Sequence, residues 1–244
     1  MMSADGSLKL PTLQDQVVVV TGASRGIGRA TAALLAVHGA RVAGCGVNLE
    51  EHPASFLDDV PDELRARCSF VRCDVASAPD VERFARQLVT TFGVPDVVVN
   101  NAGVVVRGPL EDLDDAAWQM MMNVNVSGTF FVTRAFLKGM KARGTGRIIN
   151  IASIAGRQGT AQLVAYCTAK HAVVGFTRAL AEELRGTQIK VNAVCPGSVD
   201  TEMLQIGMPG GKPNMSPQDI ANVVLYLATS APAAMSGSCV DVFG

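Results

Sequence analysis

The chain has 244 residues and a formal net charge of −1, so its charge gives no reason to expect a nucleic-acid partner. Hydrophobic residues make up 48% and charged residues 18%, which provides for a substantial buried core and argues against disorder. The apolar runs are shorter than the ~20 residues that span a bilayer, and we therefore expect no membrane partner.

The cysteines, the histidines and the first residues bear on compartment and metal binding. The six cysteines form no C-x-x-C pair and the three histidines are scattered, so we expect free thiols in a reducing, cytoplasmic compartment and no metal site. Residues 1–13 lack the apolar centre of a secretory signal, and we interpret them as a loose leader.

Strand-like apolar runs alternate with segments of helical periodicity along the chain. Strands are predicted at Val17–Val20, Arg41–Cys45, Ser69–Arg72, Val97–Val99, Arg147–Ile151, Lys190–Val194 and Ser238–Val242. Helices are predicted at Ile27–Val37, Pro79–Phe92, Asp115–Lys141, Leu163–Leu184 and Pro217–Ala228, the last capped by Ser216. This order predicts an α/β fold with one doubly wound parallel sheet of the Rossmann type and helices on both faces. With no repeat or linker, residues 14–244 are expected to form a single domain.

The run T-G-A-S-R-G-I-G, from Thr21 to Gly28, lies between the first strand and the first helix. In that context glycines let backbone N–H groups approach a pyrophosphate, and the helix N-terminus adds favourable partial positive charge. A glycine-rich turn without a ligand is the alternative.

Tyr166 and Lys170 are four residues apart in a predicted helix, which places both side chains on one helical face. A neighbouring ammonium favours the phenolate, so we expect it to lower the phenol pKa from its usual value near ~10. The pair would then serve as a proton donor to a carbonyl oxygen. A surface tyrosine beside a solvated lysine is the alternative.

The spacing T-G-x-x-x-G-x-G, the Tyr166/Lys170 pair and further motifs in fixed order resemble the short-chain dehydrogenase/reductase family. The resemblance runs from Val17 to Val242 and is closest to the branch with bacterial 3-oxoacyl-acyl-carrier-protein reductases and secondary-alcohol dehydrogenases. The other matching motifs are Asp74-Val75, Asn100–Gly103, Asn125, Ser153 and Pro196-Gly197 through Thr201.

The resemblance implies an NAD(P)-dependent oxidoreductase that reduces a ketone or oxidises a secondary alcohol. Tyr166 would be the proton donor or acceptor, and Ser153 would hold the substrate oxygen. Lys170 would bind the nicotinamide ribose and tune Tyr166. The main-chain carbonyl of Asn125 would hold a water that links Lys170 to solvent. An asparagine inside a helix also suggests a kink or a local role there, with an exposed helix asparagine as the alternative.

The resemblance also implies a set of cofactor contacts. The glycine-rich turn would contribute Gly22, Ser24, Arg25, Gly26, Ile27 and Gly28. Asp74 and Val75 would contact the adenine, and Asn101, Ala102 and Gly103 the adenosine ribose and cofactor backbone. Pro196, Gly197, Val199 and Thr201 would reach the nicotinamide carboxamide and the diphosphate, beside Tyr166 and Lys170.

The choice between NAD and NADP depends on the end of the second strand, where NAD-preferring relatives carry an aspartate for the ribose 2′-hydroxyl. Gly46 occupies that position, and Glu50 and Glu51 follow too far along. Arg25 could pair with a 2′-phosphate. We therefore favour NADP, with NAD left open because no basic residue occurs in Gly46–Asn48.

The substrate is not determined by these motifs, and an acyl-thioester ketone competes with a small alcohol or sugar-type ketone. Residues from Glu202 to Met215 are expected to form a short lid, either a mobile cover or a loop without contacts. Arg107 and Arg157 flank the expected pocket, with solvation as the default for both.

Two further questions concern turnover and assembly. A non-catalytic, cofactor-sensing or regulatory protein on the same fold is the competing function, and the complete Asn125, Ser153, Tyr166 and Lys170 set argues against it.

The resemblance implies a homotetramer formed through the 115–141 helix and the Tyr166 helix. Packing of these helices on the sheet alone is the alternative.

Overall fold

The structure is a computed structural model that describes residues 12–47 and 57–244. Residues 1–11 of the predicted leader, and Asn48, Glu50 and Glu51 near the second strand, lie outside the described residues. Leu13 is fully buried and its N–H donates to the His38 carbonyl (2.9 Å). Leu13 therefore belongs to the core, and the predicted end of the leader at residue 13 comes too late.

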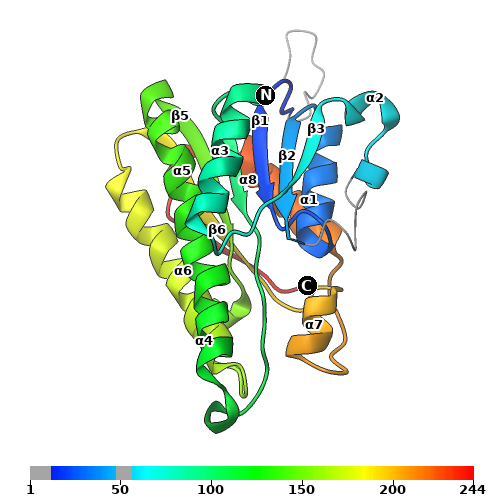
Figure 1. Cartoon of the computed structure of the whole chain (residues 1–244), viewed down its shortest axis with the longest axis vertical. Coiled ribbons are helices and arrows are strands. Elements are labelled where there is room, and N and C mark those ends of the chain that lie inside the picture. The colour runs from blue at the N-terminus through cyan, green and yellow to red at the C-terminus, as the bar shows by residue number, and fades with distance from the viewer. Residues whose placement is uncertain (1–11, 48–56) are drawn as a thin grey trace.

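The sheet has seven strands, all parallel, in the order β3-β2-β1-β4-β5-β6-β7 (Figure 1). The strands are β1 (Val17–Thr21), β2 (Arg41–Gly46), β3 (Cys68–Arg72), β4 (Val97–Asn100), β5 (Thr145–Ile151), β6 (Gln188–Pro196) and β7 (Cys239–Val242). Each contains the core of a predicted strand. The direction of winding reverses between β1 and β4, which is where ligands bind in sheets of this kind.

The helices connect the strands and cover both faces of the sheet. They are α1 (Gly26–Val37), α2 (Asp62–Arg65), α3 (Ala78–Phe92), α4 (Asp115–Met122), α5 (Gly128–Arg143), α6 (Val164–Glu183), α7 (Glu202–Gly207) and α8 (Pro217–Thr229). Figure 1 shows α4, α5 and α6 together on one side of the molecule. α7 lies apart from them, low in the view as α4 does. The predicted doubly wound Rossmann-type sheet is thus confirmed, with α2 and α7 as additions.

The core forms two layers because successive side chains on a strand point to opposite faces. Val18 and Val20 pack with α1 and α8, whereas Val17 and Val19 pack with α3, α5 and α6. Strands buried on both faces explain why these runs are continuously apolar instead of alternating.

A buried polar cluster ties α5 and α6 to the central strands. Asn100 Nδ2 of β4 donates to Asn150 Oδ1 of β5 (2.8 Å) and to Thr133 Oγ1 of α5 (3.0 Å). Asn150 Nδ2 donates in turn to Thr177 Oγ1 of α6 (2.9 Å). Since unpaired buried polar groups are costly, these bonds fix the position of α6 relative to the strand ends.

The single helix predicted at Asp115–Lys141 is interrupted by a π-helical turn, Asn123–Ser127, between α4 and α5. Asn125 Nδ2 donates to the carbonyls of Met121 and Val104 (3.0 Å each), so the side chain competes with helical backbone bonding. The local role suggested for the asparagine is thus seen as a π-helical turn, and a kink there stays a prediction. Gly144, with φ of +85°, ends α5 in the left-handed conformation that favours glycine.

Among the described residues, no helix combines the length and the apolar character that crossing a bilayer requires.

Candidate active site

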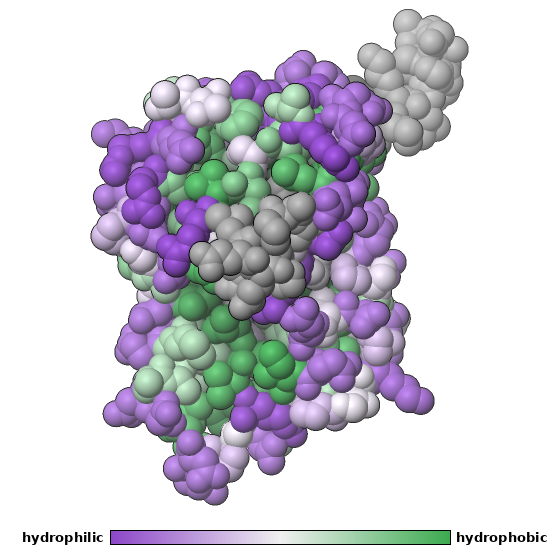
Figure 2. Space-filling model, turned by 45° about the vertical axis from the view of Figure 1, so that its right-hand side comes forward, coloured by the Kyte–Doolittle hydropathy of each residue, from purple (hydrophilic) through white to green (hydrophobic). Residues whose placement is uncertain are grey.

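A pocket of about 1670 Å³ opens at the carboxyl ends of β1, β4, β5 and β6. The turn before α1, the chain after β4, the start of α6 and most of α7 line it. Figure 2 shows hydrophobic residues gathered in the lower part of the displayed face, with hydrophilic residues around them. The pocket is large enough for a dinucleotide and a second small molecule, since drug-sized sites measure roughly 300–1,000 Å³.

The glycine-rich turn is built around close backbone approaches. A Cβ on Gly28 would lie 2.1 Å from the Gly22 carbonyl oxygen, and Gly22 itself has φ of +64°. The first turn of α1 has no side-chain cap and no acidic residue, so its backbone N–H groups are left to a ligand. This cradle fits the pyrophosphate of a dinucleotide.

Asn101 holds the glycine-rich turn in place from β4. Its Nδ2 donates to the carbonyls of Thr21 (2.9 Å) and Gly22 (3.1 Å). The Thr21 hydroxyl accepts from the N–H groups of Asn101 and Ala102 (3.0 Å each). The side chain of Asn101 therefore positions the turn, and its predicted contact with the ribose stays a prediction.

Asp74 and Val75 follow β3 at the pocket wall. Asp74 Oδ1 accepts from the Ala76 N–H (2.9 Å), which shapes the turn into α3. Val75 is buried, and its Cγ2 would lie 2.8 Å from a Cβ on Gly128. The adenine contacts predicted for the two residues stay predictions, on the side of the pocket where they were expected.

Tyr166, Lys170 and Ser153 meet in the pocket, as their motif predicts. Ser153 follows β5, and its hydroxyl accepts from the Ala155 N–H (3.1 Å). Burial raises the pKa of Tyr166 to about 12, and a hydrogen bond to Ser153 opposes that rise. The expected lowering of the phenol pKa by Lys170 is therefore wrong for this structure, because desolvation of the phenol dominates.

Lys170 is buried, and its Nζ donates to the Ile151 carbonyl (3.0 Å) at the end of β5. The same ammonium lies 5.6 Å from the centre of the Tyr166 ring. Burial lowers the pKa of Lys170 to about 8, so the ammonium is charged at neutral pH and loses its charge as the pH rises through about 8.

Asn125 lies behind the pocket wall and does not line it. A Cβ on Gly103 would lie 2.8 Å from Asn125 Oδ1, so the two pack tightly, and this oxygen is buried without a hydrogen-bond partner. The main-chain carbonyl, expected to hold a water, accepts from the Thr129 hydroxyl (2.9 Å). The water link stays a prediction, and it would use the second lone pair of this oxygen.

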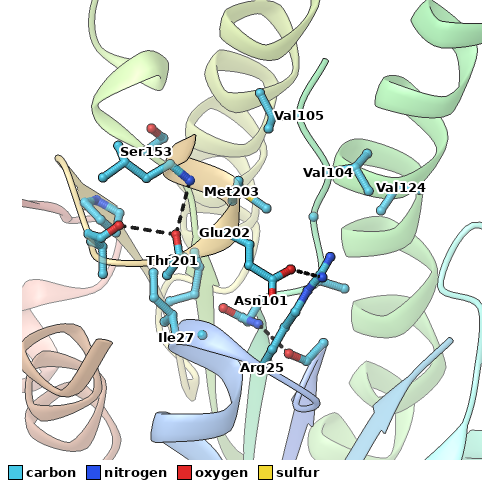
Figure 3. Close-up of a pocket in the computed structure, with 18 of the residues that line it drawn as sticks. Arg25, Ile27, Asn101, Val104, Val105, Val124, Ser153, Thr201, Glu202 and Met203 are labelled. Carbon is cyan, nitrogen blue, oxygen red and sulfur yellow. Dashed lines mark hydrogen bonds and ion pairs between the residues drawn. The ribbon is translucent and has the colours of Figure 1, made fainter. Parts of the chain in front are cut away.

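The predicted lid begins as the helix α7, which contacts the glycine-rich turn, Tyr166 and Arg107 (Figure 3). Glu202 forms an ion pair with Arg25 of the glycine-rich turn. Met203 Sδ lies 3.9 Å from the Tyr166 hydroxyl, and the guanidinium of Arg107 donates to the Gly207 carbonyl (2.8 Å). The lid is thus a contacting element, and Arg107 is one of its anchors although the residue is exposed.

The segment between β6 and α7 places four of the predicted cofactor residues. Pro196, Gly197, Val199 and Thr201 all line the pocket. Thr201 Oγ1 accepts from the Leu204 N–H (3.3 Å) and caps α7. Val199 pairs with Met215 in an isolated parallel bridge, which closes the lid loop on itself.

Nearly all predicted site residues line one pocket. These are Gly22, Ser24, Arg25, Gly26, Ile27, Asp74, Val75, Asn101, Ala102, Gly103, Ser153, Tyr166, Lys170, Pro196, Gly197, Val199 and Thr201. Gly28 and Asn125 support the wall from behind. Arg157 instead binds Asp241 Oδ1 (2.8 Å) and the Cys239 carbonyl (2.6 Å), which secures β7.

Several lining residues were not predicted. They include Arg72 at the end of β3, Asp59, and Gln119 and Met120 of α4. The sequence places Arg72 two residues before Asp74, which could have suggested that it lines the pocket. Its position beside Gly46 depends on strand pairing, which no local sequence pattern shows. Within the described residues, no cluster of three or more histidine, cysteine or acidic side chains could hold a metal ion.

The chain is similar in sequence and in fold to several known proteins. Residues 16–207 match the family described as short chain dehydrogenase. A Streptomyces coelicolor protein named as a ketoacyl reductase is 37% identical, over 96% of this chain and 98% of its own. The 3-oxoacyl-[acyl-carrier-protein] reductase FabG of Chlamydia muridarum is 32% identical, over 95% and 97%. A variant of actinorhodin polyketide ketoreductase, solved with NADPH, is 36% identical with a TM-score of 0.86, over 96% and 98%.

Proposed function

Because the chain belongs to the short-chain dehydrogenase family of oxidoreductases, we propose that it reduces a ketone to a secondary alcohol with NADPH. One observation carries the proposal: Tyr166, Ser153 and Lys170 converge on the same pocket as the glycine-rich cradle. A protein that only sensed the cofactor would have no use for a proton donor in the same pocket.

The residues divide the work as follows. A bound nicotinamide supplies the hydride. Tyr166, whose pKa of about 12 keeps it protonated at neutral pH, donates its hydroxyl proton to the substrate oxygen. Ser153 holds that oxygen by a hydrogen bond, and Lys170 offers a positive charge that stabilises the tyrosinate left behind. The Ile151 carbonyl keeps the Lys170 ammonium in place.

Two observations support NADPH over NADH. Gly46 leaves no carboxylate at the end of β2 to accept a hydrogen bond from a ribose 2′-hydroxyl. The ketoreductase structure that resembles this chain was solved with NADPH. The coarser conclusion, a nicotinamide dinucleotide in the cradle, stands on the uncapped α1 N-terminus and its close-packed glycines.

The pocket wall supports a 3-oxoacyl thioester as the substrate class. Apolar side chains dominate beyond Tyr166, namely Val104, Val105, Met120, Leu163, Met203, Leu204 and Met208. Such a wall suits an acyl chain, and relatives in two branches are named for ketoacyl or 3-oxoacyl substrates.

The test is consumption of NADPH with a panel of ketones, each assayed with both cofactors. We expect turnover with a 3-oxoacyl thioester such as acetoacetyl-CoA and slower turnover with small cyclic and open-chain ketones. The Tyr166→Phe protein is the matched control for background oxidation. Absence of turnover with every ketone, while NADPH still binds, would favour a cofactor-sensing role instead.

The setting proposed for the enzyme has separate support. The six cysteines are all free, as is usual in a reducing compartment such as the cytoplasm. Trp118 and Phe130 are exposed on α4 and α5. Such a surface on two neighbouring helices supports the homotetramer that the family resemblance implies.

A further inference from the structure

Arg72 occupies a position at the adenosine end of the pocket that strand pairing determines. It is paired in register with Gly46, the last residue of β2. Phe70, two residues earlier, lies on the same face of β3, and its ring carbon is 3.5 Å from where a Gly46 Cβ would be. Phe70 packs against the core layer of α1. Arg72 therefore emerges on the same face as the glycine-rich turn.

The other arginines beside this end of the pocket already have carboxylate partners. Arg25 is paired with Glu202, and Arg29 donates to both Asp59 carboxylate oxygens, from Nε (2.6 Å) and Nη2 (2.9 Å). Among residues 12–47 and 57–244, no carboxylate forms an ion pair with Arg72, and its side chain is exposed at the pocket. The nearby Asp80 is held by Arg83 (3.0 Å). Asp80 attracts Arg72 as a nearby charge, but the two form no ion pair among the described residues, so the Arg72 guanidinium keeps donors for a further anion.

The space in front of Arg72 suits an anion. Gly46 contributes no side chain, and the Ser24 hydroxyl lies 3.6 Å from its Cβ position. NAD-preferring relatives carry a carboxylate at the position of Gly46, which accepts from the ribose 2′-hydroxyl. Here the Ser24 hydroxyl and the Arg72 guanidinium, which are both donors, lie beside that position instead. Arginine presents a planar fork of donors that matches phosphate oxygens.

We propose that Arg72, and not the lid-paired Arg25, is the residue that recognises the 2′-phosphate of NADPH, with Ser24 as a second donor. The proposal rests on the proposed NADPH dependence and names the side chain responsible for it. It makes cofactor choice a property of the β2–β3 pair, separate from the turn that binds the pyrophosphate.

The experiment measures binding, by calorimetry on the full-length protein, of two probes that differ only in the 2′-phosphate: 2′,5′-ADP and 5′-AMP. We expect the wild type to prefer 2′,5′-ADP. Arg72→Ala should weaken 2′,5′-ADP about 10- to 100-fold, the range for charged hydrogen bonds, and leave 5′-AMP within about twofold. Arg72→Lys should fall between, because it keeps the charge and loses the fork.

Arg86→Ala is the matched control, because Arg86 is an exposed arginine on the same helix as Asp80, pairs with Glu82 instead of Asp80 and does not line the pocket. It should leave both affinities unchanged. If the wild type prefers 2′,5′-ADP and Arg72→Ala retains that preference, the role of Arg72 is overturned while NADPH dependence stands. If the wild type binds both probes equally, NADPH dependence fails and the role of Arg72 fails with it.

Discussion

The carboxylate of Glu202 faces the guanidinium of Arg25 across the mouth of the pocket, so an ion pair joins α7 to the glycine-rich turn (Figure 3). The two residues are 177 positions apart in the chain. Both side chains are more than half exposed, so the pair contributes little to stability. Its effect lies in what it holds: while it is formed, the lid is attached to the place where the cofactor phosphates are expected.

Glu202→Gln should therefore favour cofactor binding without altering the fold. Removing a carboxylate near the phosphates and releasing Arg25 should lower the Kd for NADPH about two- to fivefold, the range for an exposed ion pair. The Tm should stay within about 2 °C of the wild-type value. Glu182→Gln, which breaks an exposed pair with Arg185 away from the pocket, is the control. Weaker NADPH binding in Glu202→Gln would contradict the idea that Glu202 competes with the cofactor phosphates for Arg25.

Tyr166→Phe should lower kcat by roughly 10²–10⁴-fold, the usual contribution of a positioned general acid. The substitution removes only the hydroxyl, so the Kd for NADPH should stay within about threefold of the wild-type value. Stopped-flow reduction of the ketone measures the first quantity, and fluorescence titration measures the second. A Phe variant that keeps most of its kcat would show that another group donates the proton.

The reduction rate should fall at alkaline pH because of Lys170. Burial lowers the pKa of Lys170 to about 8, so the group is charged below that pH and neutral above it. Tyr166, with a pKa of about 12, stays protonated throughout. We expect kcat/KM for NADPH, which reports ionisations of the free enzyme, to decline above about pH 8.

Lys170→Arg is the control for that profile, since a guanidinium stays protonated across this range. Its absolute rate will be lower, but its profile should be flat from about pH 7 to 9. A wild-type profile that is equally flat would contradict the assignment of this ionisation to Lys170.

Gly46→Asp should move cofactor preference towards NADH. The new Cβ would make ordinary contacts with Phe70 (3.5 Å) and Ser24 (3.6 Å), so the backbone need not shift. The carboxylate would accept from a ribose 2′-hydroxyl, repel a 2′-phosphate and pair with the neighbouring Arg72. The ratio of kcat/KM for NADPH and NADH should change at least tenfold. Gly46→Ala separates charge from bulk, and an equal effect of both variants would exclude the electrostatic explanation.

The homotetramer proposal predicts a mass near four times 25.5 kDa by light scattering. Phe130 is exposed on α5, next to Phe131 with Arg134 stacked over both rings (4.7 and 5.5 Å). Phe130→Asp should therefore give smaller species. Val89→Asp, on an exposed position of α3, should not. A monomeric wild type at micromolar concentration would remove the proposal.

Sequence was sufficient for the elements whose causes are local. The run from Val17 to Gly28 contains its own strand, turn glycines and helix start, and its observed bounds, β1 and α1, differ from the predicted ones by single residues. Ser216 was predicted to cap the helix that follows it, and it does so in a capping box with Asp219.

Sequence was insufficient where the cause lies in distant contacts. The π-helical turn depends on a hydrogen bond from Asn125 to Val104, and the position of Arg72 depends on the register between β2 and β3. The raised pKa of Tyr166 comes from burial, which spacing on one helix does not reveal. These features are therefore known only once the chain is folded.

Because of the π-helical turn at Asn123–Ser127, the shape of the pocket also depends on how many residues this turn contains. Such a turn holds one residue more than α-helical bonding would use, and each α-helical residue advances by about 100°. Loss of one residue there would rotate α4 by that angle relative to α5 and carry Gln119 and Met120 away from the wall they form. Chain length in this segment would then alter which substrates fit, even if every wall residue kept its identity.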